Sequence, residues 1–165
     1  MRVVWIGVLC VLSLFAPAMA SDSNKPKFAP LPQDEIKRLD EQRAFVASLL
    51  TEHFPGLHLT RTKADFAVLQ KIVDAKLIKP EETWKLQSLG VAFGDALVSY
   101  IDGFSWWEVT DEYGTDPTLR YRQTTLEANA LTMISKRVEK GEEMDLQQMA
   151  DWLAKFVHDK AKDYQ

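Results

Sequence analysis

Cysteine is almost absent from this sequence: the single one, Cys10, lies in an apolar run near the N-terminus. If that run is removed by processing, the mature chain can form no disulfide and has no thiolate for metal binding or nucleophilic attack. Histidine is scarce as well, and His53, His58 and His158 lack the H-x-x-x-H and H-E-x-x-H spacings of zinc sites. Stability must therefore come from packing, and the sequence predicts neither a metal nor another cofactor.

Familiar catalytic motifs are also missing. The sequence has no G-x-S-x-G elbow, no phosphate-binding P-loop and no G-x-G-x-x-G dinucleotide motif. Asp111, Glu112 and Asp116 are clustered, but they lack the alternating Asp/Asn pattern of an EF-hand loop. Serine, histidine and aspartate side chains distant in sequence could still meet in space, so these absences disfavour an enzyme without excluding one.

Basic residues are outnumbered by acidic ones. The 165 residues include 20 Lys and Arg against 24 Asp and Glu, which gives a formal net charge of −4. An acidic chain lacks the positive field with which proteins hold nucleic acids or anionic membranes. Long apolar runs are missing beyond the N-terminus. We therefore predict no nucleic-acid partner and no integral membrane segment in the mature chain.

The one long apolar run, residues 3–15, follows Arg2 and precedes Ala-Pro-Ala-Met-Ala, which ends at Ala20. A charged start, a short hydrophobic middle and an A-x-A ending are typical of a secretory signal peptide. The small residues at its end make an uncleaved membrane anchor the less favoured alternative. We predict a signal peptide over residues 1–20 and a periplasmic or secreted mature protein. Residues 21–32 contain three prolines and are predicted to form a disordered or extended leader.

Helical periodicity dominates residues 33–165, which are enough for a single domain. Apolar residues recur every three to four positions in five segments. Pro80 suits the first turn of the third segment, and Asp145 is a typical N-cap for the last. The predicted helices cover residues 33–54, 62–77, 80–101, 131–140 and 145–157.

Between the third and fourth helices the apolar period changes from 3.6 to 2. Residues 104–113 and 119–124 are rich in aromatic and β-branched side chains and flank the turn-like segment GTDPT. They are predicted to form an antiparallel hairpin, with residues 126–130 as an optional third strand. Helices before and after a small sheet indicate an α+β domain, with about five helices around a two- or three-stranded antiparallel sheet.

The hairpin holds most of the candidate binding residues. Matching apolar side chains across the strands predicts Tyr113 opposite Leu119 and Asp111 opposite Tyr121. Asp111 then lies on a mostly apolar face, where it either caps the turn or serves as a catalytic or ligand-binding carboxylate. Trp106 points to the other face, either as an exposed binding platform beside arginines or beneath a covering element.

Two glycines add a second feature to the candidate site. Gly90 and Gly94 lie four residues apart on one face of the third helix, where each glycine lowers helix stability by about 1 kcal/mol relative to alanine. Something is expected to pack closely against them, either a neighbouring element or a ligand. Together with this glycine-bearing face, the candidate binding residues are Trp106, Asp111, Tyr113, Arg120, Arg122 and Arg137.

Three segments together resemble a bacterial domain of unknown function, the family numbered 3806. They are LGVAFGDALV (residues 89–98), WWEVTDEYGTDPTLRYR (residues 106–122) and LTMISKRVEKGE (residues 131–142). The resemblance covers roughly residues 85–143. It implies a bacterial origin, in keeping with the predicted signal peptide, and brings no activity or site with it. The family's tryptophan corresponds to either Trp106 or Trp107, so which of the two is exposed stays open.

Three functions remain open on the sequence alone. The first is a non-enzymatic periplasmic module that binds a protein or small ligand through the hairpin and the glycine-bearing helix. The second is a small hydrolase-like enzyme in which Asp111 is the acid or base, assisted by Tyr113, Arg120 or Arg137. The third is a secreted inhibitor or immunity-type protein, which no particular residue supports. The missing catalytic motifs favour the first, with an unidentified protein or small ligand as its partner.

Overall fold

The computed structural model describes residues 25–164, so the predicted signal peptide lies outside the described residues. An α+β arrangement with five helices is present, as the apolar periodicity predicts. No helix of residues 25–164 is long and apolar enough to span a bilayer. In chain order the elements are β1 (Lys27–Ala29), α1 (Gln33–His53), α2 (Asp65–Asp74), α3 (Thr83–Tyr100), β2 (Phe104–Asp111), β3 (Gly114–Tyr121), β4 (Glu127–Ala128), α4 (Ala130–Glu139), α5 (Leu146–Ala161) and a 3-10 turn (Lys162–Tyr164).

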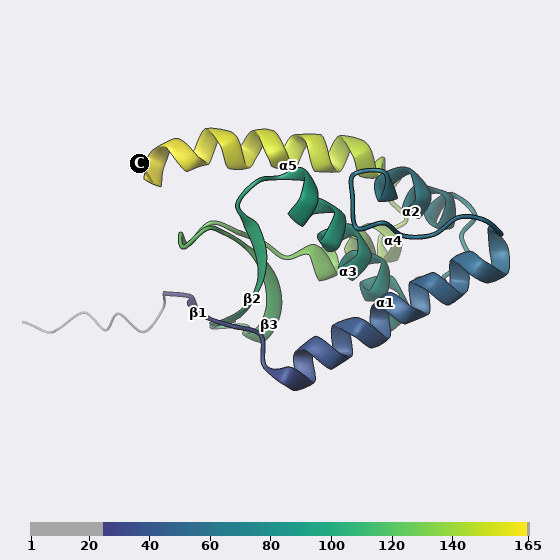
Figure 1. Ribbon diagram of the computed structural model, residues 1–165, viewed down its shortest axis with the longest axis horizontal. Helices are drawn as coiled ribbons and strands as arrows, with labels where there is room; N and C mark the ends of the chain where they lie inside the picture. The colour runs from purple at the N-terminus through teal and green to yellow at the C-terminus, as the bar shows by residue number, and fades with distance from the viewer. Residues whose placement is uncertain (1–24, 165) are drawn as a thin grey trace, which may run out of the picture.

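Helix α3 is the centre of the domain. Every residue from Ser88 to Leu97 is buried, because α1, α2, α4 and β2 all pack against it. In Figure 1, α3 runs through the middle of the molecule, with α1 along the lower edge and α5 along the top. A helix that is apolar nearly all round belongs in a core. Any polar group within this stretch must therefore find its partners inside the protein.

The sheet has four antiparallel strands in the order β1-β2-β3-β4, so the prediction of two or three strands is wrong in number. The extra strand, β1, comes from the predicted leader, and Phe28 pairs with Val109 of β2. Only three residues between prolines form this strand, which is too short to show a period of two. The optional third strand is present as β4, reduced to two residues that pair with Leu119 and Arg120.

The predicted hairpin register is wrong. Strands β2 and β3 meet at Asp111 opposite Gly114, so Glu112 and Tyr113 form a two-residue turn and GTDPT belongs to β3. Gly114 has a φ of 136°, which glycine adopts without strain. Pro117 is tolerated inside β3 because β4 ends before it, so its missing N–H leaves no bond to that neighbour unmade.

This register decides which face each hairpin side chain occupies. Trp106 lies opposite Leu119, and Phe104 lies opposite Tyr121; all four contribute to the hydrophobic core below the sheet. Trp107 and Arg120 therefore point to the other, outer face. Because side chains alternate along a strand, Phe104 and Trp106 point to the face of the sheet that packs on the helices. Trp106 contacts α3 from this face.

Candidate functional site

The structure does not bring the sequence-predicted binding residues together. Tyr113 is 87% exposed at the tip of the hairpin. Asp111 is also exposed, and its Oδ1 accepts a hydrogen bond from the backbone N–H of Tyr113 at 2.8 Å. The Asp111 carboxylate therefore caps the turn, the structural role that the sequence left open for it. It lines neither of the two cavities described below.

Trp106 is half-buried and faces the helices, which corresponds to the second of the two alternatives left open by the sequence, a tryptophan beneath a covering element. A Cβ added to Gly94 would lie 2.5 Å from Cζ2 of the indole ring. The indole Nε1 donates to Oδ1 of Asp95 at 2.9 Å. Alternation in β2 places Trp107 outside instead, where its Nε1 donates to Oγ of Ser105 at 2.9 Å.

The three candidate arginines lie in three separate places. Arg120 is on the outer face of the sheet, with its guanidinium carbon 4.2 Å from the ring centre of Phe28 and 5.0 Å from that of Trp107. This stacked arrangement fastens β1 to the hairpin. Arg122 stands beside Gly103 at the opposite end of the hairpin from the turn. The Arg137 guanidinium donates to the Met133 carbonyl of its own helix at 2.7 Å.

Gly90 and Gly94 contact protein elements closely. A Cβ at Gly90 would lie 2.5 Å from the backbone oxygen of Leu131, so the first turn of α4 rests directly on this glycine. At Gly94 the neighbours are the Trp106 ring and the Cβ of Ala130. A Cβ atom could not occupy either position without moving α4 or the indole. The two glycines thus let α4 and the sheet approach α3.

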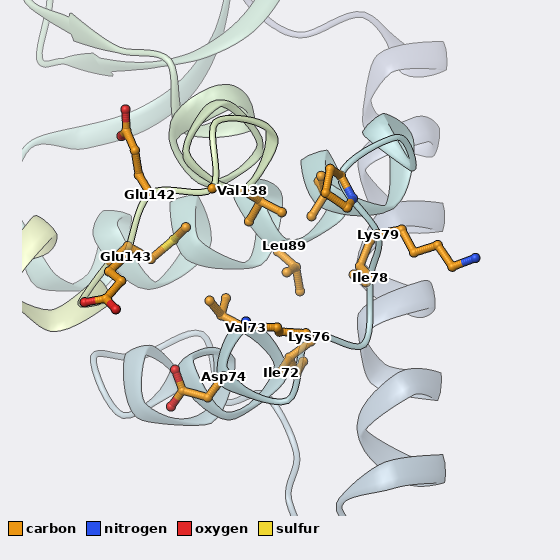
Figure 2. Close-up of a pocket in the computed structure, with 14 residues that line it drawn as sticks. Ile72, Val73, Asp74, Lys76, Ile78, Lys79, Leu89, Val138, Glu142 and Glu143 are labelled. Atoms are coloured by element: carbon orange, nitrogen blue, oxygen red, sulfur yellow. The ribbon is translucent and has the colours of Figure 1, made fainter.

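A cleft of about 610 Å³ opens between the C-terminal end of α2, the N-terminal half of α3 and the end of α4. In Figure 2, Val73, Leu89 and Val138 point towards one another across it. Pockets that bind small molecules usually have volumes of about 300–1,000 Å³ and mostly apolar walls. The apolar lining consists of Ile72, Val73, Ile78, Pro80, Leu86, Leu89, Val138 and Met144.

Charged residues surround the mouth of this cleft. In Figure 2, Asp74, Glu142 and Glu143 lie on one side of the cleft, and Lys76 and Lys79 lie on the other. Figure 2 shows the side chains of Asp74, Lys79 and Glu142 extending away from the apolar interior. The cleft thus has an apolar interior and a rim of both charges, so burial of an apolar group would leave these charges in water.

On the opposite side of α3 lies a buried ion pair. Asp95, 9% exposed, accepts two hydrogen bonds from Arg43 of α1, at 2.7 Å from Nε and 2.8 Å from Nη2. Arg43 donates a third to Asp40 at 2.8 Å. Hydrogen bonding to Asp95 raises the pKa of Arg43. With the Trp106 indole on the same carboxylate, Asp95 joins α1, α3 and β2 through one side chain.

A family of domains of unknown function, DUF3806, matches residues 65–149, slightly more than half of the chain and more than the predicted 85–143. The chain belongs to the DUF3806 family. This confirms the resemblance inferred from the hairpin and the helices beside it. No curated protein matches the sequence.

The fold of this DUF3806 protein is similar to that of a solved structure from Bacteroides thetaiotaomicron VPI-5482, a crystal structure at 1.50 Å resolution. The TM-score is 0.69 and the sequence identity is 16%, with 88% of this chain and 50% of that chain covered. The chain therefore spans about half the length of that structure. At this identity the similarity concerns the fold alone.

Every residue that lines the larger cleft lies within the DUF3806 match, whereas Arg43 lies outside it. Sequence reasoning missed both the cleft and the Arg43–Asp95 pair. The cleft is formed by the ends of three helices, and periodicity does not show how helix ends converge. Asp95 did leave a signal, since it is a lone charge in the apolar run LGVAFGDALV. A charge inside a buried helix predicts a partner, although not which one.

Proposed function

We propose that this DUF3806 protein is an exported bacterial binding module without catalytic activity, and that the cleft between α2, α3 and α4 takes an apolar group of its ligand. The cleft carries the proposal, because its volume of about 610 Å³ and apolar walls suit a small molecule or the side chains of a bound protein. The hydrolase alternative is not favoured, because the Asp111 carboxylate is exposed at the hairpin turn and away from the cleft.

Filling the cleft should strongly weaken the binding of apolar groups. Val138 is half-buried on the α4 wall, so Val138→Trp should place an indole in the cleft while α4 keeps its backbone contacts. The measurement is fluorescence of an anilinonaphthalene sulfonate dye, which brightens in an apolar pocket. We expect the unmodified protein to enhance the dye signal and Val138→Trp to lower that enhancement several-fold.

The matched control is Trp152→Ala, which removes a 62% exposed aromatic side chain outside the cleft. It should leave the dye signal nearly unchanged. Val73→Trp blocks the same cleft from the α2 side and replaces Val138→Trp if that variant does not fold. Folded blocking variants that keep the dye signal, or a Trp152→Ala variant that loses it, would show that the cleft is not the apolar binding site.

Export is tested separately by joining residues 1–32 to an alkaline phosphatase without its own signal. That reporter is active only where its disulfides form, outside the reducing cytoplasm. We expect activity and a processed fusion with residues 1–32, and no activity with residues 21–32 alone. An inactive fusion would refute export, and an active fusion that stays unprocessed in the membrane would support the anchor alternative.

A further inference from the structure

A second cavity, of about 250 Å³, lies on the side of α3 opposite the cleft. Leu86 of α3 lines the cleft, and Asp95 of the same helix lines this cavity. Nine residues separate the two, which is two and a half helical turns, so their side chains lie on opposite faces of α3. Its volume is below the range of pockets for drug-sized ligands, so it suits a smaller molecule. The apolar walls are formed by Ala44, Ala47, Leu59 and Ala92.

Two oppositely charged groups in this cavity have unused hydrogen-bonding capacity. Oδ2 of Asp95 has one short bond, from Nε of Arg43, although a carboxylate oxygen can accept two. The Arg61 side chain is 66% exposed, and its one ion pair among residues 25–164 is a 3.7 Å contact with the same Oδ2. The Asp95 carboxylate, a hydrogen-bond acceptor, and the Arg61 guanidinium, which carries several donors, therefore lie side by side at the edge of an apolar cavity.

The backbone holds Arg61 over this cavity. Arg61 has a φ of 56°, a left-handed conformation that is uncommon for a long side chain. The buried Asp65 carboxylate accepts from the backbone N–H of Arg61 at 2.7 Å, and from the N–H and hydroxyl of Thr60 at 2.9 and 2.8 Å. This loop is fixed before any ligand arrives, so binding would order little more than the Arg61 side chain.

We propose that this cavity binds a free α-amino acid with an apolar side chain. Its carboxylate accepts from the Arg61 guanidinium, and its ammonium donates to Oδ2 of Asp95. The side chain occupies the space between Ala44, Ala47 and Ala92. The lining residues carry two positive and two negative charges, which matches a ligand that carries one of each. The site is distinct from the α2–α3–α4 cleft and does not depend on the function proposed for it.

The test is titration calorimetry of the full protein with leucine, N-acetyl-leucine and leucinamide. Leucine should bind, whereas the acetylated compound lacks the ammonium and the amide lacks the carboxylate, so each should bind at least about tenfold more weakly. Arg61→Gln should weaken leucine binding to a similar extent. Ala47→Phe fills the cavity from the exposed surface of α1 without changing a charge, and should abolish leucine binding. It replaces Arg61→Gln as the test if that variant does not fold.

The chain offers a closely matched control in Arg122. It too has a left-handed backbone, with φ of 51°, a side chain 60% exposed and a long ion pair, 3.9 Å to Asp102, but it lines neither cavity. Arg122→Gln should leave leucine binding unchanged. Absence of leucine binding, equal binding of N-acetyl-leucine, or binding that survives in folded Arg61→Gln and Ala47→Phe would each overturn the proposal. The dye experiment on the larger cleft is unaffected by all of these results.

Discussion

Trp106→Ala is expected to lower the free energy of unfolding by about 3 kcal/mol, the lower end of the range for a core tryptophan, because this half-buried ring packs against the core. The indole fills the space above Gly94 and links β2 to α3 through Asp95. Removing it opens a cavity beneath the sheet and takes a hydrogen-bond donor away from a carboxylate that is almost fully buried. Urea denaturation, followed by far-UV circular dichroism, measures the change.

Trp107→Ala is the matched comparison, because it removes the same side chain from the next position of the same strand. Trp107 is half-buried on the outer face, and its ring centre lies 5.0 Å from the guanidinium carbon of Arg120, a cation–π contact of about 0.5–1 kcal/mol near the surface. The cost of Trp107→Ala should therefore be clearly smaller. If the two variants lost equal stability, Trp106 would not be the tryptophan that joins the sheet to α3.

The helices could be predicted from the sequence because their signals are local. The apolar stripes of α1, α2 and α5 repeat at helical spacing, and Asp145 caps α5 by accepting from the backbone N–H of Gln148, as its position predicts. Gly90 and Gly94 likewise indicated a close approach to α3. These features follow from the few residues around them, so no knowledge of the remaining chain was needed.

The predicted position of the hairpin turn is wrong because two local patterns in the sequence favour different turns. GTDPT contains the residues that favour turns, and pairing apolar side chains across it gave an acceptable register. The actual turn is formed by Glu112 and Tyr113, directly before GTDPT, and Gly114 follows it with a positive φ. In the observed register Tyr113 lies at the exposed tip of the hairpin, whereas the predicted register pairs it with Leu119. The predicted binding surface on the hairpin depends on the predicted register, so the structure does not contain it.

Contacts between distant residues were beyond local reasoning. Arg43 and Asp95 are 52 positions apart, and nothing in the sequence around either residue specifies the other. The same holds for the cleft, where the ends of α2 and α4 meet across Leu89. The sequence does show one charged residue, Asp95, in an otherwise apolar helix. Such a residue predicts buried polar partners but does not identify them.

Asp95→Asn is expected to destabilise the protein by about 3 kcal/mol, because breaking one side of a buried ion pair leaves the other charge uncompensated. Asparagine keeps the shape of the side chain and an oxygen to accept from Trp106. The Arg43 side chain is only 16% exposed and retains just the Asp40 carboxylate, which lies at the surface. The loss should thus reflect the missing charge and not a cavity.

The double variant Arg43→Met, Asp95→Asn distinguishes this explanation from simple loss of packing. Methionine replaces the arginine stem with an apolar chain, so no charge is left buried, and replacing both partners of such pairs is often close to neutral. We expect the double variant to be more stable than Asp95→Asn alone, with a coupling energy of about 1–3 kcal/mol in the double-mutant cycle. Additive losses from the two changes would mean that Asp95 holds α3 and β2 together through Trp106 alone, and that Arg43 contributes as a neutral side chain would.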